Sequence, residues 1–453
     1  MTRPSRGAPG VRRAPRTIAL ISLGCAKNLV DSEVMLGALK RSGYAPVADP
    51  EKADVVIVNT CGFIGPAREE AEETLASVLE LKRARPSKVV VAAGCYVERD
   101  QAALRAKFPE VDVWTGVRSF DRIAAIVEGR PVRRSGRTYL YSDASPRLVT
   151  TPGSWAYVKI SEGCSHRCGF CAIPLIKGPY VSRSAASIIR EVRALAGLGV
   201  KEIDLISHDS TWFGRDRGIR NGLAGLVERL DRVPGVEWLR FLYGYPEEIS
   251  AALIGAMAGP KVCRYFDIPF QHADRRILKA MGRGLDGGRA LRLVERLRTR
   301  LPGSAVRTSL IVGFPGEGKR EFAALRRFVE EARFDHLGVF AYSAERDTAS
   351  CALPDTVRPE EKEDRRREIM AIQAGISRAH NEGRLGRTIE VLVEGPDADA
   401  PGRWIGRGRF QAPEVDGRIR LAPPKDADRS FPAVVRARIT SASTYDLRAR
   451  LEP

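Results

Sequence analysis

The stretch Glu162-Gly-Cys-Ser-His-Arg-Cys-Gly-Phe-Cys171 places three cysteines, Cys164, Cys168 and Cys171, on one short loop. The loop follows an apolar run over 155–160 that has the length and composition of a strand. Thiolates are soft ligands that suit iron–sulfur centres, and three of them can hold three corners of a cubane cluster. Because an electron-transfer cluster normally takes a fourth cysteine, we predict a cluster with one iron open to a small-molecule ligand, by analogy with the open position of catalytic metal sites.

Two other interpretations of this loop are a zinc knuckle and a set of thiols buried in the core. A structural zinc site needs a fourth ligand, and the nearby His166 lies inside the loop, where it would bind zinc only with strain. The softness and the number of the ligands favour the iron–sulfur interpretation.

Three further cysteines each follow a predicted strand in the first part of the chain. Apolar runs over 17–23, 54–58 and 88–93 alternate with helix-like stretches, which predicts a doubly wound parallel sheet. Cys25, Cys61 and Cys95 come directly after these runs, 36 and 34 residues apart. One such cysteine is more often a buried small hydrophobe. Because the carboxyl ends of parallel strands share one edge, however, three of them should converge there, and we predict a second cluster site.

Several segments match those of a known enzyme family. Ser-Leu-Gly-Cys-Ala-Lys-Asn (22–28), Asn-Thr-Cys-Gly-Phe-Ile (59–64) and Ala-Gly-Cys-Tyr (93–96) resemble the radical S-adenosylmethionine (SAM) methylthiotransferase family. The cysteine loop, with Phe170 before its third cysteine, is similar to the radical SAM signature. The resemblance covers essentially the whole chain after residue 16.

The resemblance implies two [4Fe–4S] clusters. The first is an auxiliary cluster on Cys25, Cys61 and Cys95, which carries the sulfur that is methylated and inserted into the substrate. The second is on Cys164, Cys168 and Cys171, which the resemblance makes the catalytic residues. Its open iron binds SAM, and reductive cleavage of SAM supplies a radical. The resemblance further implies one SAM as methyl donor, one as radical source, and a flavodoxin-like or ferredoxin-like electron donor.

The chain is expected to form three domains of an α/β fold. A basic disordered tail over 1–15 precedes an N-terminal domain over 16–130 and a linker over 131–150. Repeated strand–helix units over 151–383 predict a (β/α) barrel, closed or partial, with its site at the carboxyl ends of the strands. The resemblance implies the partial form. A charged helix at the end of this domain, over 360–383, is expected to turn Lys362 and Arg365 toward solvent. Short alternating runs over 384–453 predict a small β-barrel, which resembles a TRAM domain.

Three segments that follow predicted barrel strands are candidates for the SAM site. They are 207–209, 269–272 and 313–317, and the glycines of the last segment allow a backbone to approach a ligand closely. His272 in such a place is more often a packed histidine than an acid–base group. The family usually has a glutamine where His208 stands, which leaves the role of that position open. The resemblance implies cofactor contacts from Phe170, Asp209, Gln271, Gly313, Gly316 and Glu317.

Composition narrows the partners and the compartment. The chain has 453 residues and a net charge of +18, which favours anionic partners such as nucleic acid or a ribosome. Eight cysteines without a secretory signal indicate metal binding in a reducing cytosol. No apolar run approaches the roughly 20 residues that span a bilayer. We therefore expect a cytoplasmic protein with no membrane partner.

The substrate is the point on which the family divides. Some members modify a tRNA adenosine (position 37), and one methylthiolates the β-carbon of an aspartate in small-subunit ribosomal protein S-twelve. Segments 59–64, 265–272 and 412–417 resemble the second kind. Residues 386–453 contain 12 Lys/Arg and 10 Asp/Glu, a balance of +2 that is weak for binding phosphates. We predict S-twelve, free or in the small ribosomal subunit, as the substrate. The tRNA activity and a non-catalytic iron–sulfur carrier are the alternatives.

Overall fold

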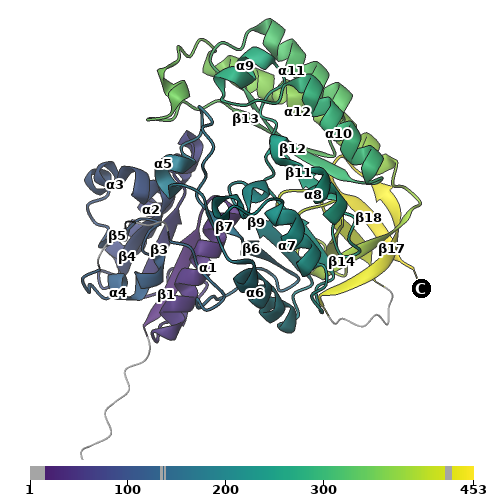
Figure 1. Cartoon of the computed structure of the whole chain (residues 1–453). Helices are drawn as coiled ribbons and strands as arrows, with labels where there is room; N and C mark the ends of the chain where they lie inside the picture. The colour runs from purple at the N-terminus through teal and green to yellow at the C-terminus, as the bar shows by residue number, and fades with distance from the viewer. Residues whose placement is uncertain (1–15, 133–135, 137–138, 424–430, 453) are drawn as a thin grey trace, which may run out of the picture.

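The computed structural model describes residues 16–132, 136, 139–423 and 431–452. The predicted basic tail over 1–15 lies outside these residues. Figure 1 shows an N-terminal α/β domain, a central domain of strands and helices, and a C-terminal β-barrel. No helix of the described residues is both long and apolar enough to cross a membrane.

The N-terminal domain is a parallel sheet with helices on both faces, as predicted. Its strand order is β2-β1-β3-β4-β5. Alternate side chains of β3 point to opposite faces, so that Val55 and Ile57 pack with α1 and α4, whereas Val56 and Val58 pack with α2 and α3. The elements are β1 (Thr17–Ser22), α1 (Ala26–Arg41), β2 (Ala45–Pro46), β3 (Val55–Thr60), α2 (Gly65–Ala84), β4 (Val89–Gly94), α3 (Cys95–Lys107), β5 (Val113–Thr115), η1 (Phe120–Arg122) and α4 (Ile123–Val127).

The central domain is an open barrel of six parallel strands. β6, β9 and β10 form one sheet and β11, β12 and β13 another, and a parallel bridge between Leu239 and Val262 joins the two. Within the described residues no pairing joins β6 to β13, so the barrel is partial, as predicted. Its strands are β6 (Trp155–Lys159), β9 (Glu202–Ile206), β10 (Trp238–Phe241), β11 (Tyr265–Asp267), β12 (Ala305–Val312) and β13 (His336–Ala341).

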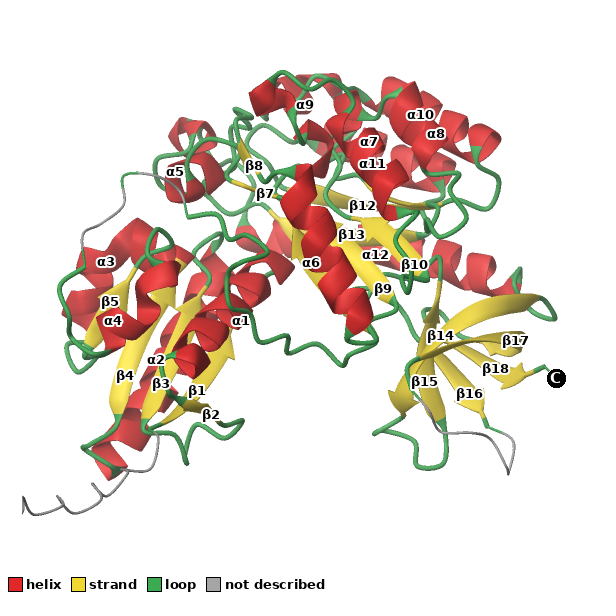
Figure 2. Cartoon of the chain, turned by 60° about the horizontal axis from the view of Figure 1, so that its bottom comes forward, coloured by secondary structure: helices red, strands yellow, loops and turns green. Residues whose placement is uncertain are grey.

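Helices cover the outer face of this barrel (Figure 2). Apolar side chains of the strands, such as Val158, Leu205 and Leu310, pack against them in one continuous core. The helices and short turns are α6 (Ala185–Gly197), η2 (Ser210–Trp212), η3 (Arg215–Arg217), α7 (Gly222–Leu230), η4 (Pro246–Glu248), α8 (Ala251–Ala256), α9 (Arg275–Ala280), α10 (Gly287–Arg300), α11 (Lys319–Ala332), η5 (Ala349–Ala352) and α12 (Pro359–Glu382).

The C-terminal domain is a closed barrel of order β14-β15-β16-β18-β17, as predicted. Residues 409–416, between its second and third strands, reach the inner face of the central barrel, and we call them the plug segment. Tyr265 donates a hydrogen bond to Asp416 (2.6 Å), and Arg240 donates to the carbonyl of Gln411 (3.0 Å). The plug segment therefore joins the two barrels at the amino ends of the central strands. The strands are β14 (Thr388–Pro396), β15 (Trp404–Gly408), β16 (Ile419–Ala422), β17 (Ala433–Ala442) and β18 (Leu447–Leu451).

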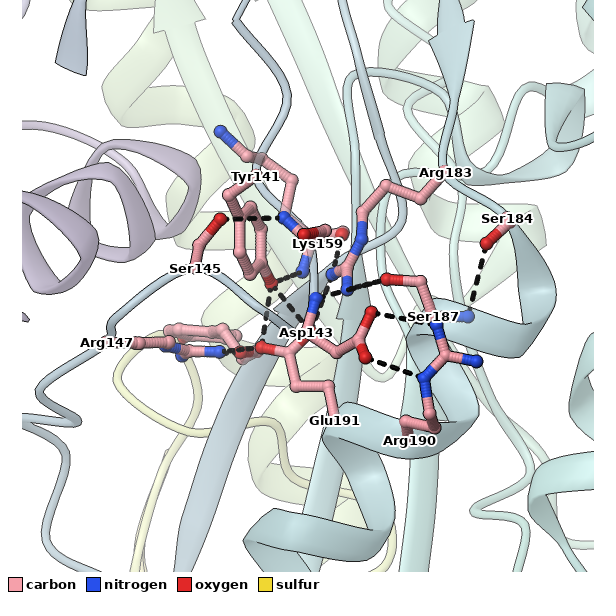
Figure 3. A network of polar contacts seen from close by, with 12 residues as sticks. Tyr141, Asp143, Ser145, Arg147, Lys159, Arg183, Ser184, Ser187, Arg190 and Glu191 are labelled. Carbon is pink, nitrogen blue, oxygen red and sulfur yellow. Dashed lines mark hydrogen bonds and ion pairs between the residues drawn. The ribbon is translucent and has the colours of Figure 1, made fainter. Parts of the chain in front are cut away.

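Residues 139–150, which fall in the predicted linker, are packed between the N-terminal and central domains, and we call them the strap. Arg147 donates hydrogen bonds to Glu33 of α1 and to Glu191 of α6, each with a donor–acceptor distance of 2.6 Å. Tyr141 is buried and donates to the same Glu191 carboxylate (3.0 Å), which also accepts from Arg183 (2.6 Å), as Figure 3 shows. The strap thus ties the two domains together through charge-assisted hydrogen bonds.

A second contact joins the N-terminal domain to the other edge of the partial barrel. Glu345, which follows β13, is buried and accepts from the backbone N–H of Gly65 (3.1 Å) and from Arg99 (2.7 Å). Since α1 packs beside β6, the N-terminal domain contacts both sides of the opening that the unpaired edge strands leave.

Candidate active site

The predicted cluster loop lies at the carboxyl end of β6. After β6 the chain forms the short strand β7 (Ser161–Glu162), which pairs with β8 (Val181–Ser182). Gly163 has φ +73°, and a Cβ there would lie 2.2 Å from the carbonyl oxygen of Pro179, so the tight turn requires glycine. Cys164 then donates its backbone N–H to Gly178 (3.1 Å). Residues 163–164, at the start of the loop, therefore contact residues 178–179, which follow α5 (Ile173–Lys177), and these backbone contacts close the loop.

The far side of the loop is attached to the opposite part of the barrel. Gly169 donates its N–H to the carbonyl of Met281 (2.9 Å) and accepts from the N–H of Ser350 (2.8 Å). Phe170, a predicted cofactor contact, is half-buried and packs on an apolar cluster that includes Phe314 and Tyr342. Cys164, Cys168 and Cys171, the loop trio, are thus held on a loop that is anchored at both ends.

Cys25, Cys61 and Cys95, the strand-end trio, follow β1, β3 and β4 at one edge of the N-terminal sheet. The three strand ends touch: a Cβ at Gly24 would lie 2.8 Å from Cys61 Sγ, and one at Gly62 would lie 2.6 Å from Cα of Tyr96. These close approaches explain the glycines next to Cys25 and Cys61. The topology brings the three predicted ligands to one edge, as their position after the strands indicates.

The donor chemistry of both trios fits iron–sulfur clusters. Burial raises the pKa of Cys61 and Cys164 to about 11 and that of Cys95 and Cys171 to about 12. Such thiols stay protonated at neutral pH unless a metal displaces the proton. Among the residues that the structure describes, no three His, Cys, Asp or Glu side chains are placed to hold a single metal ion. A cubane binds each thiolate to a different iron and so fits ligands that do not surround one ion.

Basic side chains accompany both trios. Arg283 Nη1 lies 3.7 Å from Cys168 Sγ, and the same guanidinium donates to the carbonyl of Pro269 (2.6 Å). The charge of Lys177 acts on Cys95 against the effect of burial, and Lys27 acts in the same way on Cys61. Arg283 and Lys177 would balance the negative charge of thiolate-bound clusters.

Asp209, a predicted cofactor contact, binds a residue of the cluster loop. Its Oδ2 lies 2.6 Å from His166 Nε2, and its Oδ1 accepts from the N–H of Thr211 (2.9 Å). The His166 ring stacks on Tyr245 with 3.8 Å between centroids and 6° between planes. The contact fixes the loop from the β9 side, between Cys164 and Cys168, which sequence reasoning did not find.

Gln271, in the segment that follows β11, has φ +71°, in the left-handed region that non-glycine residues rarely adopt. Its N–H donates to Ser309 (2.9 Å) and its carbonyl accepts from Ile311 (2.7 Å), so the neighbouring strand holds the conformation. Tyr243, after β10, has φ +63°. Two strained residues at adjacent strand ends mark this edge as a functional region.

Gly313, Gly316 and Glu317 form a turn after β12, and the carboxylate of this turn has protein partners. Glu317 is buried, accepts from Arg365 (2.6 Å) and from the N–H of Gly313 (2.9 Å), and lies 3.2 Å from His272 Nε2. Its side chain therefore holds the turn in place. Gly313 and Gly316 have φ of +71° and +84°, a backbone conformation that glycine adopts readily and that other residues rarely do.

The prediction that Lys362 and Arg365 face solvent is wrong. Both are buried, because α12 packs on the barrel beside the Gly313 turn. Lys362 lies so close to Gly313 that a Cβ there would come within 2.3 Å of its Cγ. The charged pattern of the helix hid this face, since Arg365 pairs with the buried Glu317 after β12 as well as with Glu361 of its own helix.

A group of four buried charges lies between the two trios, and we call it the buried lattice. Lys159 bonds to Asp31 of α1 and lies 2.6 Å from Glu162, while Lys177 lies 3.0 Å from Asp31 and 3.5 Å from Glu162. His208 Nδ1 lies 3.6 Å from Glu162, and burial, reinforced by nearby lysines, lowers its pKa well below the usual range. The lattice joins α1, which follows Cys25, to the loop of Cys164. The one sequence signal was Lys159 itself, a lysine inside an apolar strand.

The arrangement defines a class of protein: a radical SAM enzyme with a small C-terminal β-barrel. Family models agree along the chain. They are "Uncharacterized protein family UPF0004" over residues 17–116, "Radical SAM superfamily" over 158–329 and "TRAM domain" over 385–451. As a member of the radical SAM superfamily, the chain uses SAM and iron–sulfur chemistry.

Relatives of nearly the same length narrow the class. The chain is 43% identical to the ribosomal protein uS12 methylthiotransferase RimO of Solibacter usitatus, over 95% of this chain and 93% of the relative. It is also 43% identical to the RimO protein of Aquifex aeolicus, over 96% of both chains. The chain belongs to this methylthiotransferase family and is an enzyme.

Solved structures support the fold. The radical SAM methyltransferase TsrM of Kitasatospora setae, with cobalamin and a [4Fe–4S] cluster bound, has a TM-score of 0.55 at 17% identity. The alignment covers 74% of this chain and 77% of that chain. At this identity the similarity concerns the fold alone.

Proposed function

We propose that this enzyme methylthiolates the β-carbon of an aspartate in ribosomal protein uS12, the S-twelve protein of the small subunit, free or assembled. The observation that carries the proposal is the 43% identity over 95% of the chain to a relative named for that reaction. We propose that the enzyme acts in the cytoplasm, where ribosomes are made. A flavodoxin-like or ferredoxin-like protein is the proposed electron donor.

The cofactors are proposed to be two [4Fe–4S] clusters and SAM. The loop trio would hold the cluster that binds SAM, and the strand-end trio would hold the auxiliary cluster. When bound, one SAM would supply the methyl group and a second would supply the radical. A radical is required because no side-chain base removes a proton from an unactivated carbon at pH 7.

The protein's own part is to bind, orient and shield. The backbone contacts of Gly169 fix the loop trio to the barrel, and the pair of Asp209 and His166 fixes it from the β9 side. The buried lattice fixes α1, and with it Cys25, against the same loop. Because the folded enzyme holds two reactive centres and a target side chain in line, the reaction step itself does not carry the entropic cost of bringing them together.

Contacts to SAM are proposed from the residues that surround the mouth of the barrel. Phe170 and Gln271 offer side chains, Gly313 and Gly316 offer backbone, and Asp209 acts through His166. Glu317 takes a positioning role, since Arg365, His272 and Gly313 occupy its carboxylate.

The test is a comparison of uS12 and tRNA from cells that lack the gene, complemented with the wild-type gene or with its Cys61→Ala variant. Intact-mass analysis of uS12 should show a methylthio group only with the wild-type gene, and the tRNA nucleosides should be the same in all strains. A methylthio group that disappears from tRNA adenosine, with uS12 unchanged, would replace the proposed substrate by tRNA. A methylthio group on uS12 with Cys61→Ala would refute the auxiliary cluster.

A further inference from the structure

Lys27 is a buried cation for which the described residues offer no carboxylate. The side chain is only 6% exposed, and among the described residues no Asp or Glu oxygen lies within 4.0 Å of its ammonium. The ammonium lies over the Tyr243 ring, 3.2 Å from the centroid. Every other buried lysine near the trios, namely Lys159 and Lys177, has carboxylate partners. A desolvated charge without a carboxylate partner is costly, so this one calls for an anion that the described part of the chain does not supply.

The position of Lys27 is the second observation. It lies in the first turn of α1, two residues after Cys25, and Tyr243 belongs to the carboxyl end of β10. The ammonium is also close enough to Cys61 and His208 to act on both electrostatically. Cys25 is exposed and Tyr243 only half-buried, so the ammonium lies just below a rim that solvent reaches. The site is therefore between the strand-end trio and the mouth of the barrel.

The surroundings hold the ammonium toward that rim. Tyr243 has φ +63°, and its N–H donates to Asp267 Oδ2 (3.0 Å), which anchors the strained residue. Asp267 is in turn paired with Arg307 (3.0 Å), and its charge acts on Lys27 from beyond the 4.0 Å of an ion pair. A tyrosine face attracts an ammonium but does not neutralise it, which leaves Lys27 able to bind a carboxylate as well.

We propose that Lys27 is a specificity-determining residue that binds the carboxylate of the aspartate to be modified. This inference rests on the proposed function. The β-carbon of aspartate is bonded directly to its carboxylate carbon, so an ammonium that holds the carboxylate holds the reacting carbon one bond away. A charged hydrogen bond in a water-poor site also discriminates against the neutral amide of asparagine.

The experiment uses the reconstituted holoenzyme with purified uS12 and with uS12 in which the target aspartate is replaced by asparagine. Wild-type enzyme should prefer the aspartate protein by roughly 10- to 100-fold in kcat/KM, as expected for a hydrogen bond to a charged group. Lys27→Met should lose this preference, mainly through the aspartate substrate, while Lys27→Arg should keep part of it. SAM cleavage without uS12 depends on the loop trio and should stay at the wild-type level, and the iron content is measured alongside.

Lys88→Met is the matched control, because Lys88 is equally buried in the same domain but donates to backbone carbonyls, including that of Pro50 (2.8 Å). That variant should keep the preference for aspartate. Lys27→Gln replaces Lys27→Met if the latter does not fold. If the variant without the charge keeps the preference for aspartate, or if it loses its iron, Lys27 is not the residue that selects the substrate. The inference about Lys27 is then wrong, while the proposed function still stands. If wild-type enzyme leaves uS12 unmodified, the proposed function fails and the inference fails with it.

Discussion

The two trios of cysteines are built in opposite ways. The loop trio comes from eight consecutive residues, 164–171, and hydrogen bonds of the backbone hold it in place. The strand-end trio comes from three strands, and its members are separated by 36 and 34 residues. Its geometry depends on the register of the sheet, in which Ser22 pairs with Asn59 and Thr60 pairs with Gly94.

This difference separates what is local from what is shared. The loop trio needs a tight turn and two anchors, whereas the strand-end trio needs the whole N-terminal domain. The distance between the trios depends on neither, because the buried lattice, the strap and the contacts of Glu345 set it. A variant can therefore damage one trio, the other, or only their alignment.

The largest expected effect comes from removing one cysteine of each trio. Cys168→Ala should abolish SAM cleavage and product, a loss of roughly 10⁴-fold or more, because the cluster proposed on the loop trio is the source of that chemistry. Cys95→Ala should abolish the methylthio product but retain SAM cleavage. Assays of 5′-deoxyadenosine and of product measure the two effects.

Iron analysis sharpens this comparison. Each variant should lose about four irons per chain, the content of one cubane. Cys263→Ala is the control, because Cys263 is buried in the core outside both trios and should keep all iron. Equal loss of both activities in Cys168→Ala and Cys95→Ala would contradict the division of labour.

Next in size is the loss of alignment in Asp31→Ala. This change leaves Lys159 and Lys177 buried with one carboxylate fewer, which should destabilise the protein by about 3–5 kcal/mol. SAM cleavage should persist while formation of product falls, because the trios remain but their relative position is lost. Thermal unfolding and the ratio of product to cleaved SAM measure the two effects. Asp364→Ala, at an exposed pair with Arg367, should cost less than about 1 kcal/mol and change neither activity.

A smaller effect should follow from raising the pH until Tyr141 of the strap loses its proton. Burial, reinforced by Glu191, raises the pKa of Tyr141 to about 12, whereas tyrosine in the unfolded chain titrates near 10. The native state thus keeps its proton where the unfolded state loses it, so stability is complete below pH 10 and falls as pH rises to 12. The loss is at most about 3 kcal/mol. Urea unfolding across this range should show a shallower decline for Tyr141→Phe, and an unchanged slope would contradict the assignment.

The smallest expected effect concerns the plug segment, away from both trios. Tyr265→Phe removes the hydrogen bond to Asp416, which still accepts from the N–H of Ala412 (2.8 Å) and lies 3.3 Å from His336. The free energy of unfolding should fall by about 1–2 kcal/mol. Iron content and SAM cleavage should match the wild type, and a loss of either would link the plug segment to the clusters.

Much of the fold could be read from local patterns. Alternation of apolar strands and helices predicted the parallel sheet and a barrel, since each strand is buried on both faces and each helix on one. That the barrel is partial was implied by the family resemblance. The position of Cys25, Cys61 and Cys95 after their strands predicted their common edge. The charged pattern over 360–383 led to the wrong prediction that Arg365 faces solvent, because Arg365 is paired with Glu317, 48 residues away in the chain.

By itself, then, the sequence determined the loop trio, the strand-end positions and the order of the domains, because each depends on spacing along the chain. Only the tertiary structure decided which charges are paired. Lys159 meets Asp31 across 128 residues, and Lys27 meets Tyr243 rather than a carboxylate. Burial makes such pairings costly to break and costly to leave incomplete. The hydrophobic periodicity of the sequence does not predict them, because the partners are far apart in the chain. The alignment of the two trios follows from these long-range pairs.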